Sequence, residues 1–311
     1  MAEELSYADV DAAAARIAGR VRPITVARAE PAGELWFALE FLQHTGSFKA
    51  RGAANFLEAH HVSGTLPAAG VTIASGGNAG LACAWAAARR GVPATVFLPA
   101  TAPAVKVERL HSYGAQVRLE SDYPAAFAAS QAFAAETGAL TSHAYDHPLI
   151  VAGAGTLLTE VHQALPDLDT IVVAAGGGGL FAGIATAAAR HGIRTVAVEP
   201  EYCRALNAAL EAGHPVDVEV DSIAADSLGG PRATDMALRA AQLGDTVSVL
   251  VPDAQIIAAR RALWEERRIA VEHAAATALA ALRAGAYRPA AGERVCVVLC
   301  GANTDPADLT P

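Results

Sequence analysis

Long apolar runs are missing from this chain of 311 residues. Hydrophobic residues make up 53% of it and the mean hydropathy is +0.28, yet no stretch of about 20 apolar residues runs without glycine, proline or a charge. The sequence therefore predicts no membrane span. The N-terminal segment MAEELSYADVDAAAARIAGR also lacks a basic start followed by an apolar block. That argues against a secretory signal and favours a cytoplasmic location.

Positive charge and cysteine are also scarce. The chain has 23 basic and 32 acidic residues, which gives a net charge of −9, and its basic residues form no cluster larger than a pair. We therefore expect no nucleic-acid partner and no binding to an anionic membrane surface. No CxxC pair occurs among the four cysteines. Neither a zinc site nor a disulfide framework is indicated.

What the chain does contain is an alternation of short β-branched runs with alanine-rich segments. The β-branched runs predict strands at 35–39, 71–74, 94–98, 116–119, 170–174, 194–198, 246–251 and 295–299. The segments between them predict helices at 80–90, 125–137, 155–165, 179–190, 253–266 and 273–284.

This order of elements predicts the fold class. Strands separated by helices of this length indicate βαβ units and a parallel sheet, so we expect an α/β doubly wound fold. The length suggests about two domains. In such sheets ligands bind beyond the carboxyl ends of the strands, and the loops at those ends are the places to look for a site.

Two of these loops are rich in glycine. The loop ASGGNAG, residues 74–80, ends an apolar strand and opens a helix, so its amides and the helix dipole can bind an anion. The alternative is an ordinary tight turn with Asn78 in a left-handed conformation. The run from Gly176 to Gly179 lies between another strand and helix, and it favours a nest of amides around a phosphate over a structural turn.

Two further residues lie near predicted strand ends. Cys300 closes the strand at 295–299, although a buried structural cysteine is the ordinary interpretation. Lys49 lies in TGSFKARG, residues 45–52, beside a helix predicted to start at Phe48. A lysine and a phosphate cradle in one cleft suggest pyridoxal 5′-phosphate, whose aldehyde reacts with a lysine amine and whose phosphate needs several amide donors. Thr45, Gly46 and Ser47 are then interpreted as small because the cofactor lies close.

These motifs, in this order, resemble the fold-type II pyridoxal-phosphate enzymes, of the tryptophan synthase β-subunit-like fold, and specifically their serine/threonine dehydratase branch. The similarity covers roughly residues 20 to 305. It rests on FALEFLQHTGSFKARGAANFL, ASGGNAGLACAWAAARRGVPATVFLPATAPAVKVERLHSYGAQVRL, DHPLIVAGAGTLLTEV, VVAAGGGGLFAGIATA, VAVEP and LCGANTD.

The resemblance implies a role for each matching position. Lys49 would be the lysine that bonds to the cofactor, and Phe48 would pack beside the ring. Asn78 would hydrogen-bond the ring hydroxyl, and Ser75, Gly76, Gly77 and Asn78 would bind the substrate carboxylate. The remaining cofactor-binding residues implied are Gly176, Gly177, Gly178, Gly179, Leu180, Glu272 and Cys300, of which Cys300 would face the pyridine nitrogen. His273 departs from the family pattern, in which proline follows this glutamate.

The family's architecture implies two domains and a homodimer. A large cofactor-binding domain would comprise residues 1–44 and 146–311, and a small mobile domain would comprise residues 45–145. Because the sequence stops soon after the Cys300 motif, the C-terminal regulatory domain of biosynthetic threonine dehydratases is not expected.

The departures from related enzymes narrow the chemistry. A thiol at Cys300 makes only weak hydrogen bonds and cannot keep a ring nitrogen protonated as an aspartate would, which favours β-elimination over transamination. Gly76 stands where the family's racemases carry a serine that moves a proton. Metal-binding members pair the glutamate of VEP, here Glu199, with an aspartate at the position of Ala205, so no metal site is expected.

The function expected is therefore a dehydratase that eliminates water and then ammonia from L-serine or L-threonine. Elimination from another β-hydroxy amino acid such as 3-hydroxyaspartate, β-replacement and racemisation remain alternatives. A protein that binds pyridoxal phosphate or a nucleotide without turnover is the non-enzymatic alternative.

Overall fold

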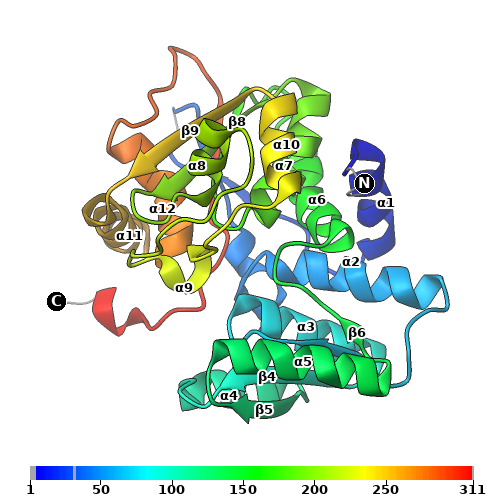
Figure 1. Cartoon of the computed structure of the whole chain (residues 1–311). Coiled ribbons are helices and arrows are strands. Elements are labelled where there is room, and N and C mark those ends of the chain that lie inside the picture. Colours follow the sequence, from blue (N-terminus) through cyan, green and yellow to red (C-terminus); the bar gives the residue numbers. More distant parts are fainter. Residues whose placement is uncertain (1–4, 31–32, 310–311) are drawn as a thin grey trace.

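The computed structural model describes residues 5–30 and 33–309. Its described strands form two sheets, which Figure 1 shows one above the other. The six-stranded sheet has the order β1-β2-β10-β7-β8-β9, and the four-stranded sheet has the order β5-β4-β3-β6. All neighbouring strands are parallel except β1 and β2. The strands are β1 (Val26–Arg28), β2 (Leu35–Ala38), β3 (Val71–Ile73), β4 (Ala94–Pro99), β5 (Gln116–Glu120), β6 (Leu140–Thr141), β7 (Thr170–Ala174), β8 (Arg194–Pro200), β9 (Thr246–Val251) and β10 (Val295–Val298).

Helices cover both sheets. In Figure 1, α3, α4 and α5 lie with the small sheet in the lower part of the view, and α2 runs between the two sheets. The α-helices are α1 (Tyr7–Ile17), α2 (Lys49–Val62), α3 (Asn78–Arg90), α4 (Ala104–Ser112), α5 (Tyr123–Thr137), α6 (Pro148–Ala164), α7 (Gly179–His191), α8 (Ala205–Ala212), α9 (Ala225–Leu228), α10 (Asp235–Leu243), α11 (Asp253–Arg267) and α12 (His273–Arg283). Three short 3-10 helices are η1 (Glu40–Leu42), η2 (His44–Gly46) and η3 (Pro306–Leu309).

The predicted α/β class is confirmed, and every predicted strand is present with its ends shifted by at most a residue or two. The pattern did not predict the antiparallel edge strand β1, the two-residue strand β6, or helices α1, α4, α8, α9 and α10. Helix α6 also begins at Pro148 and not at residue 155. The N-terminal segment discussed above includes residues 1–4, which lie outside the described residues.

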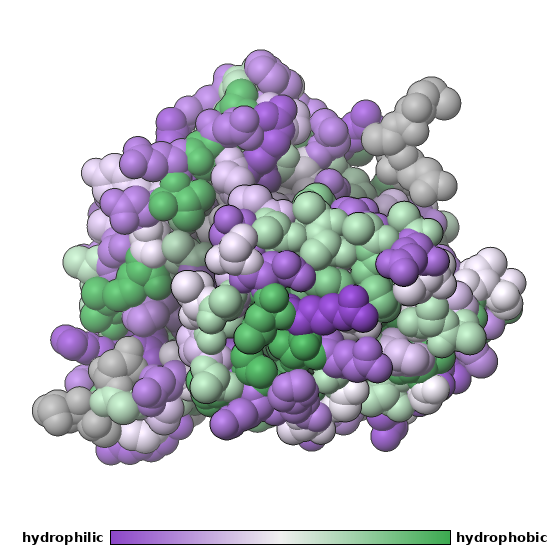
Figure 2. Space-filling view, turned by 60° about the horizontal axis from the view of Figure 1, so that its bottom comes forward, coloured by the Kyte–Doolittle hydropathy of each residue, from purple (hydrophilic) through white to green (hydrophobic). Residues whose placement is uncertain are grey.

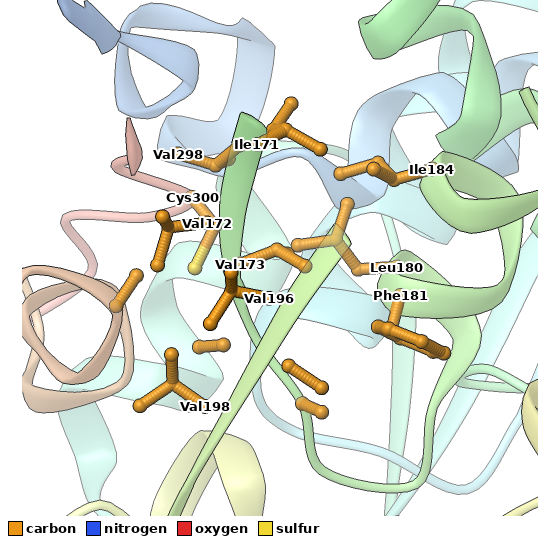
Figure 3. Close-up of a cluster of buried hydrophobic side chains, with 14 of the residues drawn as sticks. Ile171, Val172, Val173, Leu180, Phe181, Ile184, Val196, Val198, Val298 and Cys300 are labelled. Atoms are coloured by element: carbon orange, nitrogen blue, oxygen red, sulfur yellow. The ribbon is translucent and has the colours of Figure 1, made fainter. Parts of the chain in front are cut away.

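The larger hydrophobic core is built on β7, β8 and β10. All residues of β7 and β10 are buried, as expected for central strands covered on both faces. Figure 3 shows side chains of β7 and β8 beside Leu180, Phe181 and Ile184 of α7. Cys300 belongs to the same cluster, just beyond β10. A second cluster surrounds the small sheet and includes buried side chains of α2 and α3.

Helices α6 and α7 pack with their backbones in direct contact. A Cβ on Gly155 would stand 2.7 Å from the carbonyl oxygen of Gly183. A Cβ on Gly183 would stand 2.6 Å from the amide nitrogen of Gly155. Gly153, on α6, faces α2 in the same way, with Gly52 Cα 2.7 Å from its Cβ position. Glycine weakens an isolated helix, but here these glycines permit close contact between helices.

The hydrophobic character of the helices and of the surface bears on whether the chain could cross a membrane. None of the helices in the described part of the chain combines the length and the apolar character needed to cross a lipid bilayer. Figure 2, which brings the lower part of Figure 1 forward, shows hydrophobic residues gathered near the middle of a largely polar face. The exposed apolar side chains of the small sheet and its helices include Leu119 of β5 and Phe127 of α5.

The contact between α6 and α7 predicts that Gly183→Ala destabilises the protein. Its methyl group would overlap the backbone of α6, and overpacking of this kind costs about 2 kcal/mol. Urea unfolding measures the loss, and Thr186→Ala, on the more open side of the same helix, is the control with a change below about 0.5 kcal/mol. Equal unfolding midpoints for Gly183→Ala and the parent would contradict this packing.

Candidate active site

A cavity of about 530 Å³ lies where the two sheets meet, beyond the carboxyl ends of β3, β4, β7 and β10. This is the position expected for a ligand in parallel sheets. Its wall includes every residue to which the sequence assigned a site role. They are Phe48, Lys49, Ser75, Gly76, Gly77, Asn78, Gly176, Gly177, Gly178, Gly179, Leu180, Glu272 and Cys300.

Lys49 is placed by the segment that precedes it. The amide of Phe48 donates to the carbonyl of Cys300 at 2.9 Å, and Ser47 forms an antiparallel bridge with Gly301. The amide of Ala302 donates to the carbonyl of Gly46 at 2.9 Å. Residues 46–48 therefore pair with residues 300–302, which follow β10. As a result, Lys49 begins α2 directly beside Cys300.

The same contacts give another reason for the small residues before Phe48. None of Thr45, Gly46 and Ser47 lines the cavity. Thr45 and Gly46 have positive φ angles of 63° and 75°, and a Cβ on Gly46 would stand 2.7 Å from Oδ1 of Asn303. The interpretation that these residues are small because of a nearby cofactor stays a prediction. The positive φ and the contact with Asn303 give a separate reason for glycine at position 46.

Helix α2 is held by a buried ion-pair network around Arg51. The guanidinium of Arg51 donates to both carboxylate oxygens of Glu40, at 2.6 and 3.0 Å, and to both of Glu160, at 2.7 and 3.0 Å. A fifth hydrogen bond reaches Oγ1 of Thr156 at 3.2 Å. Although burial alone would lower the pKa of Arg51, the two carboxylates raise it. All five N–H donors of the guanidinium are therefore used.

The amine of Lys49 lies in a setting that favours its neutral form. Its Nζ donates to the carbonyl of Ala144 at 2.6 Å and lies 4.7 Å from the centre of the Phe48 ring. Burial lowers the pKa of Lys49 from 10.5 to about 8, against the opposing influence of Cys300 and Glu272. A neutral lysine can act as a nucleophile or as a base.

Asn78 and Glu272 form a polar pair on the cavity wall. Nδ2 of Asn78 donates to both carboxylate oxygens of Glu272, at 2.9 and 3.1 Å, and Nδ2 of Asn303 donates to Oδ1 of Asn78 at 2.6 Å. A Cβ on Gly301 would overlap the Glu272 carboxylate. Burial raises the pKa of Glu272, while the Asn78 amide opposes that rise. Asn78 begins α3 and has no positive φ, so a left-handed turn does not explain it.

The glycine run has properties of both an anion site and a packing site. The residues from Gly176 to Leu180 are buried, and within the described residues no carbonyl accepts a hydrogen bond from their amides. Buried amides rarely lack a partner, so these are available to a ligand. Protein contacts also require glycine here: a Cβ on Gly177 would overlap the Tyr145 ring, and a Cβ on Gly178 would overlap Ala237.

The loop from Ser75 to Asn78 closes the opposite side of the cavity. A Cβ on Gly76 would stand 2.7 Å from Cδ2 of Leu98, whereas a Cβ on Gly77 would have no atom within 4 Å. The loop leads into the N-terminus of α3, where free amides and the helix dipole favour a carboxylate. A side chain at position 76 would therefore require the end of the Leu98 side chain to move, whereas Gly77 faces open space.

Cys300 and Glu199 have different surroundings. Burial raises the pKa of the Cys300 thiol, so it is held as a neutral group at the cavity wall.

The Glu199 carboxylate accepts hydrogen bonds from the amides of Leu206 and Asn207 at 2.9 and 2.7 Å and so caps α8. Ala205, at the start of that helix, is fully buried. The described residues contain no group of three or more His, Cys, Asp or Glu side chains arranged to hold a metal ion.

Sequence reasoning missed several residues of the site. Lys106 and Asp226 line the cavity and form an ion pair with Nζ and Oδ1 2.7 Å apart. Tyr145 packs against the glycine run, and Asn303 supports Asn78. One available signal was that Lys49 and Lys106 are the only lysines in the chain. The contacts of Tyr145 and Asn303 join segments too distant in the sequence for a local pattern to reveal.

Comparison with known proteins extends these observations. A sequence profile described as "Pyridoxal-phosphate dependent enzyme" matches residues 20–301. A phenylserine dehydratase of Ralstonia pickettii is 38% identical over 273 residues, which cover 87% of this chain and 83% of the relative. An L-threonine ammonia-lyase of Geobacter sulfurreducens is 40% identical over 277 residues, which cover 87% of this chain and 67% of the relative.

The fold is similar to that of a solved serine racemase. The maize serine racemase structure superposes with a TM-score of 0.90 at 30% sequence identity, and the match covers 99% of this chain and 96% of that one. By name, the sequence relatives include an ammonia-lyase and the similar structures include a racemase.

The buried setting of Lys49 predicts an unusual reactivity. In the folded protein without added ligand, acetylation of Lys49 by acetic anhydride should increase with pH around a midpoint of about 8, because the neutral amine is the reactive form. In urea-unfolded protein the midpoint should return to about 10.5. Peptide mass spectrometry measures both curves, and the same midpoint in both states would contradict the assignment.

The network around Arg51 predicts a large loss of stability in Arg51→Ala. Two carboxylates would lose their partner, and Glu40 is almost fully buried; removing one member of a buried pair typically costs about 3–5 kcal/mol. Arg294→Ala removes an exposed pair with Asp167 and should have a much smaller effect, because solvent screens exposed ion pairs. Urea unfolding compares the two, and similar losses would mean that the network does not hold α2.

Proposed function

Since the chain belongs to the family of pyridoxal-phosphate dependent enzymes, we propose that it is a dehydratase of β-hydroxy amino acids. It would eliminate water and then ammonia from L-serine or L-threonine and release a 2-oxo acid. The observation that carries this proposal is that the lysine amine with a lowered pKa and the unpaired amides of the glycine run line one cavity. The relatives named dehydratase and ammonia-lyase support the reaction class.

The residues of the cavity fit pyridoxal phosphate. The amides from Gly176 to Leu180 are buried and have no acceptor among the described residues, which leaves them available to a phosphate. Lys49 supplies the amine, and Phe48 supplies an aromatic surface beside it. Cys300 would face the ring nitrogen as a neutral thiol, and Asn78, held by Glu272, would face the ring hydroxyl. Bound pyridoxal phosphate supplies an aldehyde for the substrate amine and a ring that withdraws electrons from the substrate α-carbon.

The chain's own groups then have distinct tasks. The loop from Ser75 to Asn78 would bind the substrate carboxylate through its amides and so orient the α-carbon toward Lys49. Nζ of Lys49, neutral in part at physiological pH, would take the α-proton. The Cys300 thiol cannot stabilise a positive charge on the ring nitrogen as a carboxylate would, which favours loss of the β-hydroxyl over transamination.

Racemisation is the second candidate, because the maize serine racemase shares the fold. The chain offers no hydroxyl at Gly76, and a side chain there would displace Leu98. A racemase needs a proton donor on the face opposite Lys49, so Gly76 favours elimination. Replacement of the β-substituent by another nucleophile would use the same residues, and the assay below separates it from elimination.

We further propose the domain division and the assembly of the protein. Residues 1–44 and 146–311 would form a large domain and residues 45–145 a small mobile one, although 1–4, 31–32, 310 and 311 lie outside the described residues. The two sheets with their separate cores support this division. The four unpaired cysteines support a cytoplasmic location. A homodimer is proposed from the family resemblance, and light scattering of the purified protein tests it.

The function predicts production of 2-oxo acid and ammonia in equal amounts from L-serine or L-threonine by the protein supplied with pyridoxal phosphate. Lys49→Ala should lower the rate at least about a hundredfold, because it removes the base and the attachment point. Glu211→Gln, which changes an exposed carboxylate paired with Arg204, is the control with an unchanged rate.

Four outcomes distinguish the alternatives. Rapid formation of the D-amino acid, seen by chiral chromatography, would favour racemisation. Turnover of only 3-hydroxyaspartate would move the assignment to that substrate. Product formation that needs an added thiol would favour β-replacement. If no absorbance of pyridoxal phosphate stays with the protein after unbound cofactor is removed, only the nucleotide-binding alternative is left.

A further inference from the structure

Both lysines of the chain line the same cavity. All other basic residues among the 23 are arginines, and the exposed ion pairs elsewhere in the described residues use arginine. Lys49 lies at the inner wall, beside Cys300. Lys106 lies where the cavity opens, with 37% of its side chain exposed.

Lys106 and Asp226 face each other across the opening. Lys106 belongs to α4, which packs with the small sheet, and Asp226 belongs to α9, which contacts α12 of the larger unit. Nζ of Lys106 and Oδ1 of Asp226 are 2.7 Å apart, and 67% of the Asp226 side chain is exposed. An exposed pair of this kind adds little to stability. Both of its charges line the cavity, where a ligand would meet them.

The rest of this part of the wall carries no charge. Leu98, Pro99, Ala102, Pro103 and Tyr123 line the cavity on the side of the small sheet. The acidic and basic side chains of the cavity, among the described residues, are Lys49, Lys106, Asp226 and Glu272. Lys49 and Glu272 lie at the inner end with the proposed cofactor site. Lys106 and Asp226 are thus the charged groups that a substituent pointing toward the opening would meet.

We propose that the Lys106–Asp226 pair determines substrate specificity by keeping the outer part of the cavity electrically neutral. With Lys106 neutralised by Asp226, an amino acid with an uncharged β-substituent is accepted. A second carboxylate, as in 3-hydroxyaspartate, meets a neutralised cation and the negative charge of Asp226. This inference rests on the proposed function for its substrate class, and it selects neutral β-hydroxy amino acids over acidic ones.

The proposal predicts a change of selectivity in Asp226→Asn. This variant frees the Lys106 charge and removes the opposing one, so kcat/KM for L-threo-3-hydroxyaspartate relative to L-threonine should rise about tenfold at low salt. The change should appear mainly in KM and shrink as salt is added, because the groups are exposed to solvent. Lys106→Gln should lower this ratio below that of the parent protein, because only the negative charge of Asp226 remains. Lys106→Arg should keep the ratio of the parent protein, because the positive charge is kept.

Asp217→Asn is the matched control. Asp217 forms an exposed pair with Arg232 at 3.1 Å and does not line the cavity, so its removal should leave the selectivity ratio unchanged. An unchanged ratio in Asp226→Asn, or an equal change in Asp217→Asn, would overturn the proposal.

A binding measurement keeps this test independent of turnover. Titration calorimetry of the protein loaded with pyridoxal phosphate gives Kd for L-aspartate and L-alanine, which lack the β-hydroxyl. Asp226→Asn should strengthen binding of L-aspartate relative to L-alanine about tenfold. If this shift occurs without any dehydratase activity, the proposed function is wrong and the charge selection stands. If activity is present and neither ratio shifts, the proposed function stands and the charge selection is wrong.

Discussion

The position of Lys49 depends on the buried guanidinium of Arg51, two residues further along α2. Because Arg51 uses all its donors on Glu40, Glu160 and Thr156, the first turn of α2 is tied to the end of β2 and to α6. The helix cannot turn about its axis without leaving the buried charges of Arg51 and Glu40 unpaired. The direction in which Lys49 enters the cavity is therefore set by an interaction on the opposite side of its own helix.

The fold could be predicted largely from local patterns. The β-branched runs were long and well bounded, so β7 and β9 have the predicted ends. The failures have physical causes. Strand β1 is three residues long and pairs with β2 through contacts that no period in the sequence reveals. Helix α6 was predicted to begin at residue 155, but it begins at Pro148. It contains Gly153 and Gly155, and glycine weakens isolated helices. Here the loss is offset by backbone contacts with α2 and α7.

The site residues that belong to a recognisable local motif could be predicted from the sequence. Lys49, the glycine run and Asn78 line one cavity as the sequence suggested. The reason for glycine at each position was less accessible. Gly177 and Gly178 make room for Tyr145 and Ala237 as well as leaving their amides free. Lys106 and Asp226 were overlooked because a charged residue in a solvated helix has no local signature of function. The two residues are far apart in the sequence, and only the packing of the chain brings α4 close to α9.

The four cysteines are all buried and unpaired. The thiols of Cys83, Cys296 and Cys300 are held in their unreactive protonated form because burial raises their pKa. A cysteine introduced on the surface would thus be the readily labelled thiol of the molecule without any prior removal of native ones. One such residue on α5 and another on α10 would carry a pair of fluorophores on the two sheets, and their separation could be followed while substrate binds.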